Sequence, residues 1–461
     1  MAEHPKTGEE EITEADYALD ADLVPAVRDA VAAGDRDRIH DLFEPLHPAD
    51  IADLLEQLKP AQRREVLGLA GDLIDGETLS EIDEGIREEV IESLPAEVLA
   101  DAVRDLESDD VVDLVEDLDA SQQEAILDAL DRPDRAAVEA ALSFPEFSAG
   151  RLMQTEVVAA PAHWNVGQAI DYLRAQEDLP EQFYHLILVD PKHRPVGYVT
   201  LGKLMSSRRE VALSSITEPS FRTIPATQDE GEVAYAFNQY HLISAPVVDE
   251  DGRLIGVITI DDAMVVLDEE HEEDILRLAG VGEEKLSDTP VAIAGRRFPW
   301  LFVNLVTAIL ASLVIAQFEA TIAAIVALAV LMPIVASMGG NAGTQTLTVA
   351  VRSLATKDLT PANALRVIGR EVGAGLLNGI AFAILMAIVG IIWFGTPMLG
   401  VVLAAAMVIN LVVAGFAGIL VPLTLDRAGI DPALASGAFV TTVTDVVGFF
   451  AFLGLAQMLL L

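Results

Sequence analysis

The sequence has no cysteine and only six lysines among its 461 residues. The absence of cysteine excludes a disulfide framework and any metal site with thiolate ligands. All eight histidines lie before residue 272, so the last part of the chain has no histidine to ligate a metal. Positive charge is scarce overall, and the net charge is −44. Such a charge excludes nucleic acid as a partner and favours cations.

The acidity and the apolar residues lie in different parts of the chain. Residues 298–461 carry five Lys/Arg and six Asp/Glu, whereas residues 1–297 carry 24 and 67. A hydrophobic content of 52% with a mean hydropathy of +0.39 is too high for a soluble protein of this charge. We therefore expect an acidic soluble module followed by a membrane part. The excess acid fits either a salt-adapted cytoplasm, in a prokaryote, or cation sensing, and both explanations remain open.

The first part of the soluble module is predicted to be all-helical. Residues 1–18 have the composition of a disordered acidic tail, and they contain no signal peptide, so the module should stay in the cytoplasm. Within residues 19–145, phrases such as LHPADIADLLEQL and LPAEVLADAVRDL echo one another. Apolar residues recur at intervals of three and four, and Pro or Asp opens each helix. This pattern predicts a helical-repeat N-domain.

Residues 146–267 contain a second kind of repeat. ILVDPKHRPVGYVTLGKLM matches PVVDEDGRLIGVITIDDAM at a constant offset of 59 residues. Each copy reads as strand, turn, strand and helix, and the tandem unit resembles a pair of α/β cystathionine-β-synthase (CBS) domains. That resemblance implies an adenine nucleotide such as ATP as ligand, with Thr259 and Asp262 at the ribose and phosphate. The first copy has Thr200 and Lys203 there, so one nucleotide site is expected.

Residues 268–297 form an acidic connector into the membrane part, residues 298–461. Each apolar stretch of the membrane part reaches the ~20 residues needed to span a bilayer. The stretches are 298–317, 321–351, 372–395, 398–425 and 433–461. We therefore expect an all-α membrane domain of five helices.

Loop charges set the expected orientation in the cell membrane. Arg296 and Arg297 precede the first apolar stretch, four basic residues separate the second from the third, and Arg427 precedes the fifth. The other two loops have none, so the N-terminal module should be cytoplasmic and the C-terminus outside. An odd number of helices excludes an inverted repeat, so any pore symmetry requires oligomerisation.

Asp445 is a lone carboxylate in the last apolar stretch. An ionised Asp at bilayer depth costs at least ~3 kcal/mol and usually faces a water-filled path. Gly437, Thr441 and Gly448 share its stripe at helical spacing, which presents small groups and oxygens. A hard cation that prefers oxygen ligands fits this stripe.

The second apolar stretch contains PIVASMGGNAGTQ, from Pro333 to Gln345. Proline and three glycines weaken a helix, so freed backbone carbonyls lining a cavity are one expectation. Close helix packing on small residues is the alternative. Asn341 and Gln345, one turn apart, favour a functional face.

Together with GIDPALASGAFVTTVTDVVGFF and FPEFSAGRLM, this motif resembles the MgtE family of magnesium channels and transporters. The resemblance implies a homodimer with a pore on the twofold axis, closed by a plug helix when the cytosolic module binds Mg²⁺. Asp445 matches the pore aspartate, Thr441 a pore-lining position and Asp431 an acidic position at the cytosolic mouth. Gly437 stands where some members carry Asn, which puts selectivity there in question.

The resemblance also extends to regulatory ligands. EEHEEDILRLAG matches the acidic stretch that leads into the plug helix, so Glu270, Glu273 and Asp274, with Asp262, are candidate ligands for regulatory Mg²⁺. Clustered carboxylates repel one another until a divalent cation bridges them. The N-domain should supply partner ligands that the sequence does not identify.

Three other functions remain to be weighed. A secondary transporter of Mg²⁺, Co²⁺ or Mn²⁺ would use the same oxygen ligands. A membrane metalloprotease would need histidines at bilayer depth, which the sequence lacks, so we expect no enzyme. A non-transporting sensor would carry no flux and gives no reason for Asp445.

Overall fold

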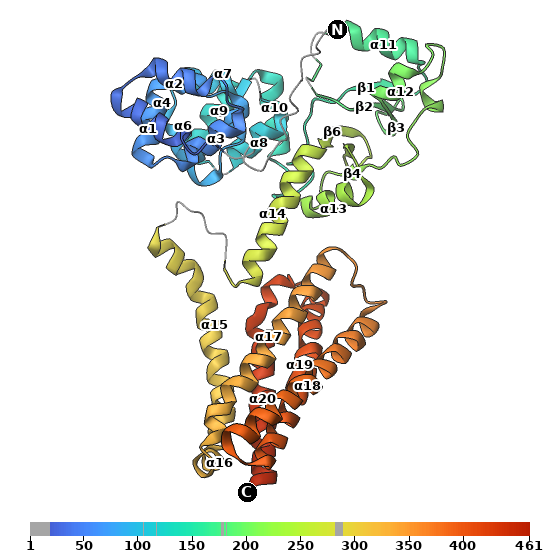
Figure 1. Cartoon of the computed structure of the whole chain (residues 1–461). Coiled ribbons are helices and arrows are strands. Elements are labelled where there is room, and N and C mark those ends of the chain that lie inside the picture. The colour runs from blue at the N-terminus through green and yellow to red at the C-terminus, as the bar shows by residue number, and fades with distance from the viewer. Residues whose placement is uncertain (1–18, 105, 117, 177–178, 181, 282–288) are drawn as a thin grey trace, which may run out of the picture. The chain divides into compact units, whose positions relative to one another are not determined.

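The computed structural model describes residues 19–461 except 105, 117, 177–178, 181 and 282–288 (Figure 1). The predicted tail and part of the connector lie outside the described residues. By its internal contacts the chain divides into two units, Met1–Leu267 and Asp268–Leu461, and each is described separately.

The first unit begins with short amphipathic helices. They are α1 (Leu23–Ala33), α2 (Arg36–Phe43), α3 (Pro48–Gln57), α4 (Pro60–Ala70), α5 (Gly76–Ser80), α6 (Glu84–Ser93), α7 (Ala96–Arg104), α8 (Ser108–Glu116), α9 (Ala120–Ala129) and α10 (Arg132–Ala141). A short 3₁₀ turn, η2 (Gly71–Leu73), follows α4. No strand occurs among the described residues of this segment, as predicted.

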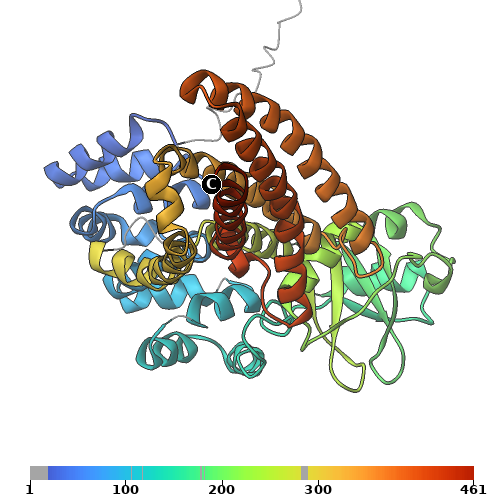
Figure 2. The same ribbon diagram turned by 90° about the horizontal axis from the view of Figure 1, so that it is seen from below.

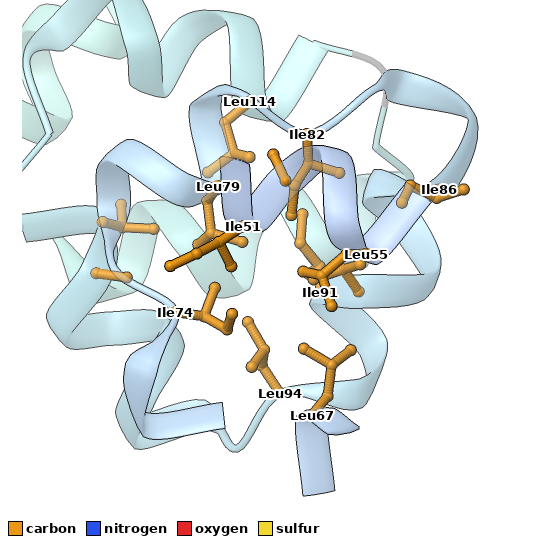
Figure 3. Packing of buried hydrophobic residues seen from close by; sticks show 14 of the residues in the cluster. Ile51, Leu55, Leu67, Ile74, Leu79, Ile82, Ile86, Ile91, Leu94 and Leu114 are labelled. Carbon is orange, nitrogen blue, oxygen red and sulfur yellow. The ribbon is translucent and has the colours of Figure 1, made fainter. Parts of the chain in front are cut away.

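Local sequence signals explain where these helices begin. Pro48 and Pro60 occupy the first turns of α3 and α4, where the missing N–H is not needed. The side chain of Asp75 accepts the N–H of Thr78 at 2.9 Å and caps α5. In the interior, Leu and Ile side chains from several helices point toward one another (Figure 3), among them Leu55 and Leu79. Each fully buried Leu contributes about 1.5–3 kcal/mol.

The rest of the first unit holds two three-stranded sheets. Their strands are β1 (Ala159–Pro161), β2 (His185–Val189), β3 (Pro195–Thr200), β4 (Ile224–Pro225), β5 (Ser244–Val248) and β6 (Leu254–Thr259). The accompanying helices are α11 (Val166–Ala175), α12 (Leu201–Ser206), η3 (Leu213–Ser215), α13 (Glu230–Tyr240) and α14 (Ile260–Leu278). In each sheet the first strand pairs parallel and the third antiparallel to the middle strand.

The two sheets repeat each other in detail. His185 pairs with Thr200 in the first sheet, and Ser244 pairs with Thr259 in the second, at the predicted offset. Each antiparallel pair has a register shift at the same place. The turn residues with positive φ, His193 (62°) and Gly252 (77°), are also equivalent. The sequence repeat therefore corresponds to a repeat in backbone structure.

The second unit contains the apolar helices. They are α15 (Pro290–Ala316), α17 (Ala327–Ala355), α18 (Ala364–Phe394), α19 (Pro397–Arg427) and α20 (Ser436–Leu460), with a short α16 (Glu319–Ala324) and η4 (Ala433–Ala435). Among the described residues, five helices are long and apolar enough to cross a membrane. Figure 2 shows α18 and α19 side by side, and Gly375 and Gly379 of α18 lie directly against the α19 backbone.

Three features of this unit differ from the prediction. Helices α15 and α18 begin at Pro290 and Ala364, before the predicted starts at residues 298 and 372. Thr321 belongs to the separate helix α16. Helix α17 runs unbroken through Pro333 and the glycines that follow it, so the expected unwound segment with freed carbonyls is wrong. Those glycines serve close packing instead, because a methyl group at Gly339 or Gly343 would clash with a neighbouring helix.

Candidate functional site

Asp445 lies half-buried on α20, inside the helix segment that is apolar enough to cross a membrane. Among the described residues it has no hydrogen-bond or ion-pair partner. A carboxylate without a partner at such a depth is costly unless water or a cation reaches it. The structure thus leaves its oxygens available to a cation.

Helix α17 packs against α20 next to Asp445. A methyl group at Gly340 would lie 3.4 Å from Cγ2 of Thr441, and one at Gly437 would lie 3.6 Å from Oγ1 of Thr344. The hydroxyl of Thr441 donates to the backbone oxygen of Gly437 at 2.6 Å, so its oxygen can still accept a hydrogen bond from a hydrated ion. The predicted positions 437 and 441 therefore lie where the two helices meet.

A polar face of α17 is exposed in the part of the chain that the structure describes. This polar seam follows helical spacing over three turns. It consists of Ser337, Asn341, Thr344, Gln345 and Thr348, all exposed. Nδ2 of Asn341 donates to Oγ of Ser337 at 3.3 Å, which satisfies only part of the seam's hydrogen-bonding capacity. Polar side chains facing lipid are unfavourable, so a seam of this length at membrane depth implies water or another protein surface beside it.

Asn410 of α19 is a buried polar residue that the sequence analysis did not single out. Its side chain is fully buried, Nδ2 donates to the backbone oxygen of Val335 at 2.8 Å, and Oδ1 has no partner among the described groups. The amide lies between Gly339 of α17 and Gly448 of α20. Gly448 is therefore a packing position and does not belong to the open stripe around Asp445.

An acidic interface joins the N-domain to the second CBS repeat within the first unit. Glu107, Asp109 and Asp110 at the start of α8 lie close enough to Asp262 to perturb one another's ionisation. Asp109 is 9% exposed. These N-domain acids, which the sequence did not single out, are neighbours of Asp262. Glu270, Glu273 and Asp274 lie two or more turns further along α14 and do not share this interface.

Burial and mutual repulsion raise the pKa values of the four carboxyl groups at the acidic interface, Glu107, Asp109, Asp110 and Asp262. Burial first, then the charges of Glu156 and Asp262, raises the pKa of Glu107 to about 7. Burial and then Glu107 raises the pKa of Asp110 to about 6. Burial, followed by repulsion between neighbouring acids, raises the pKa values of Asp109 and Asp262 as well. A proton or a divalent cation would relieve this repulsion.

Hydrogen bonds of Ser108 and one ion pair also hold this interface together. The hydroxyl of Ser108 donates to Glu156 at 2.8 Å and accepts the N–H of Thr155 at 2.8 Å. Arg151 pairs with Glu116 at 2.7 Å. The N-domain therefore has contacts to the CBS pair that do not depend on a cation.

A second acidic cluster lies in the other unit, where α14 ends. Nη1 of Arg277 lies 2.5 Å from Oδ2 of Asp431, and Arg277 also pairs with Glu273. Burial, then repulsion from Asp431 and Glu270, raises the pKa of Asp274. The predicted residues 270, 273, 274 and 431 thus lie together, with a guanidinium among them.

A small hollow opens between the CBS repeats. Its lining includes Phe183, Tyr184, His185, Ser244 and Thr259. His185 and Ser244 occupy equivalent positions in the two repeats and lie 2.5 Å apart from Nδ1 to Oγ, and burial lowers the pKa of His185.

Of the predicted nucleotide ligands, Thr259 lines this hollow. Its hydroxyl interacts with Asp261 and, at 2.8 Å, with Oδ2 of Asp262. Asp262 is turned to the acidic interface and is not a lining residue. The hollow and the interface are therefore joined through Thr259.

Within the described ranges, no three acidic or histidine side chains converge closely enough to hold one cation. Mg²⁺ dehydrates reluctantly and is usually held by one or two carboxylates and several waters. The clusters above suit such a hydrated ion better than a fully dehydrated one.

Comparison with known proteins gives a consistent result for each part. Residues 332–455 match the family described as a divalent cation transporter, residues 46–147 match the MgtE intracellular N domain, and residues 149–210 and 213–269 match the CBS domain. The magnesium transporter MgtE of Enterococcus faecalis is 34% identical over 311 residues, which is 68% of this chain and 69% of that protein. The chain belongs to the MgtE family of magnesium transporters. The MgtE of Thermus thermophilus is 35% identical over 319 residues, 68% of this chain and 70% of that protein.

Among solved structures, the cytosolic domain of the Mg²⁺ channel MgtE in complex with ATP is similar to this MgtE-family chain. It is 30% identical, with a TM-score of 0.49 and coverage of 53% of this chain and 100% of that one. The predicted architecture of helical N-domain, CBS pair and five apolar helices is confirmed. The family is one of membrane transporters, not of enzymes.

Proposed function

We propose that this MgtE-family chain forms a homodimeric Mg²⁺ channel, for magnesium uptake across the cell membrane, that closes when intracellular Mg²⁺ binds its acidic cytosolic region. The observation that carries the proposal is the unpartnered carboxylate of Asp445 beside the polar seam of α17. A pore needs such groups, whereas a membrane sensor without flux does not.

The polar seam supports the homodimer. A second copy related by a twofold axis would place the same seam opposite, so that polar side chains face each other across water and not lipid. Two Asp445 carboxylates, one from each copy, would then hold a hydrated Mg²⁺ weakly enough to release it. Thr441, Gly437, Asn341 and Gln345 would line the path.

The acidic interface and the cluster at the end of α14 support regulation by Mg²⁺. Carboxyl groups with raised pKa values gain most when a divalent cation joins them. Mg²⁺ at Asp262 would tie the N-domain to the CBS pair, and Mg²⁺ at Glu270, Glu273, Asp274 and Asp431 would hold α14 to the membrane unit. Basic loops on one side orient this region to the cytoplasm and the C-terminus to the outside.

The hollow between the CBS repeats is a second, regulatory binding site in this proposal, for an adenine nucleotide. Phe183 and Tyr184 offer rings for a base, and Glu156 offers a carboxylate for ribose hydroxyls. Because Asp261 and Asp262 lie next to Thr259, the phosphates should bind with Mg²⁺. Tyr184→Ala should weaken ATP binding, measured by calorimetry, and Tyr172→Ala on α11 is the control.

The first test is uptake of isotope-labelled Mg²⁺ into proteoliposomes. Asp445→Asn should abolish uptake, because the substitution removes the charge at nearly unchanged volume. Asp358→Asn, which changes an exposed loop carboxylate, is the matched control and should transport normally. Normal uptake by Asp445→Asn would show that the pore assignment is wrong. Absence of uptake by the unaltered protein would favour a non-transporting sensor.

The driving force for Mg²⁺ uptake distinguishes a channel from a secondary transporter. A channel should carry Mg²⁺ down its own electrochemical gradient without any gradient of protons or sodium. Uptake that requires such a gradient, or that is equally fast for Co²⁺ and Mn²⁺, would favour the transporter.

A further inference from the structure

Arg277 is the last residue but one of α14 and pairs with two carboxylates of the second unit. Nη1 is 2.5 Å from Oδ2 of Asp431, and Nη2 pairs with Glu273 one turn earlier on the same helix. The other oxygen of Asp431, Oδ1, accepts the backbone N–H of Ala433 at 2.8 Å. Both oxygens of Asp431 therefore already have partners within the protein.

The next residue, Leu278, makes an apolar contact at the same place. It packs against a cluster from the ends of α17, α19 and α20. The members of that cluster are Leu347, Val351, Ala417, Ala433 and Val440. Adjacent residues of α14 thus hold it to the membrane unit, one by an ion pair and one by apolar burial, and neither contact involves a metal.

The carboxyl groups around Asp431 create a negative region in which the guanidinium of Arg277 is the neighbouring positive charge. Glu270, Glu273 and Asp274 bring three more carboxyl groups to the end of α14. A regulatory cation that reaches Asp431 must displace Arg277 or share the carboxylate with it. Arginine keeps its charge at any physiological pH and is less strongly hydrated than Mg²⁺. Because it is tethered, its local concentration is high.

We propose that the guanidinium of Arg277 is a tethered cation that occupies the Asp431 site in place of regulatory Mg²⁺. Without Mg²⁺ it holds α14 on the membrane unit in only a fraction of the molecules, so that flux at low Mg²⁺ stays below its maximum. When Mg²⁺ is plentiful, it competes with the ion for Asp431. This inference rests on the proposed function, since it assumes that docking of α14 reduces flux. Arg277 acts through α14 and does not touch the transported ion.

Two effects of Arg277→Gln follow. Without the guanidinium, the carboxylates repel one another at low Mg²⁺, α14 is released and flux rises by about two- to fivefold, the range that a partly exposed ion pair supplies. At saturating Mg²⁺ the ion bridges the freed carboxylates and flux falls to the level of the unaltered protein. Arg277→Lys keeps the charge but loses the planar fork, so its flux should lie between the two.

The test is labelled-Mg²⁺ uptake by the full-length protein in proteoliposomes, with the luminal Mg²⁺ set by a buffer. Asp431→Asn removes the same ion pair, so the double variant with Arg277→Gln should give the low-Mg²⁺ flux of either single variant. Arg253→Gln, which alters an exposed arginine paired with Asp251 in the first unit, is the control and should change nothing.

The outcomes separate the inference from the function on which it rests. Inhibition of the unaltered protein by luminal Mg²⁺, with a raised low-Mg²⁺ flux in Arg277→Gln, supports the inference. If Mg²⁺ inhibits the unaltered protein but Arg277→Gln has the same flux as the unaltered protein at low Mg²⁺, Arg277 does not act as a tethered cation. A uniform loss of flux together with a lower unfolding temperature would show a structural ion pair and would also overturn it. If Mg²⁺ fails to inhibit the unaltered protein, the proposed regulation itself is wrong.

Discussion

The side-chain amide of Asn410 donates to the backbone oxygen of Val335 at 2.8 Å, and this bond ties α19 to α17 directly after Pro333. The same amide lies against Gly448 of α20, three residues beyond Asp445. One buried amide therefore fixes the spacing of three membrane helices next to the proposed ion site.

Gly448→Ala should destabilise the protein by about 1 to 3 kcal/mol, the usual effect of overpacking. A methyl group there would lie 2.7 Å from Nδ2 of Asn410, and the amide cannot move without losing its bond to Val335. Denaturation of the purified protein in detergent measures the change. Gly373→Ala on α18 is the control, because nothing lies within 4 Å of the added methyl group. Equal stability of both variants would mean that the amide is not a rigid contact.

Acid pH should stabilise the first unit when Mg²⁺ is absent. Glu107 and Asp110 have pKa values raised to about 7 and about 6 in the fold, above those of an unfolded chain. At pH values between the unfolded and the folded pKa, the folded state binds more protons than the unfolded state. The free energy of unfolding therefore falls as the pH rises, and the contribution is lost once the pH has passed about 6 to 7. Calorimetry at several pH values checks this, and Glu107→Gln should flatten the profile. A profile that rises over the same range would contradict the raised pKa values.

Mg²⁺ should raise the unfolding temperature of the protein, and Asp109→Asn should reduce that increase. Asp109 is buried beside Asp262, and a ligand stabilises the state that binds it. The variant without Mg²⁺ should be more stable than the unaltered protein, because one buried charge has been removed. Asp134→Asn in α10, an exposed position, serves as the control. An undiminished Mg²⁺ effect in Asp109→Asn would place the cation elsewhere.

The lack of cysteine makes the proposed dimer directly testable. In this chain a single introduced cysteine can form a disulfide only with a second copy. Gln345→Cys lies on the polar seam and should cross-link in membranes under mild oxidation, since equivalent residues approach each other across a twofold axis. Leu377→Cys on α18, whose side chain is 71% exposed, should remain monomeric on a denaturing gel. Cross-linking of the second variant but not the first would move the interface to α18.

The features that the sequence predicted correctly share a physical origin. Helix periods, proline and aspartate at helix starts, and the repeated strand and turn pattern are local properties, and each is visible within about twenty residues. They were enough for the helical N-domain, the CBS pair and the number of apolar helices. The end of a helix is less well defined locally, which is why α15 begins earlier than residue 298.

What the sequence did not predict depends on contacts between distant segments. The acids at the start of α8 were visible in the phrase LESDDVVDLVEDL, but nothing local shows that they meet Asp262. Asn410 was missed although a lone amide in an apolar helix is a signal of the same kind as Asp445. The glycines after Pro333 were interpreted as helix breakers because their partner, Asn410, lies more than seventy residues away.

The constant offset between the CBS repeats has an evolutionary consequence. Register, bulge and the left-handed turn residue are the same in both copies, whereas the side chains at equivalent positions have diverged. Lys203 pairs with Glu218, which follows η3 and precedes β4, while its counterpart Asp262 faces the N-domain. A duplicated segment keeps one copy to maintain the scaffold and leaves the other free to acquire a new contact. In this chain the second copy is the one whose helix start, at Asp262, meets the acids of the N-domain.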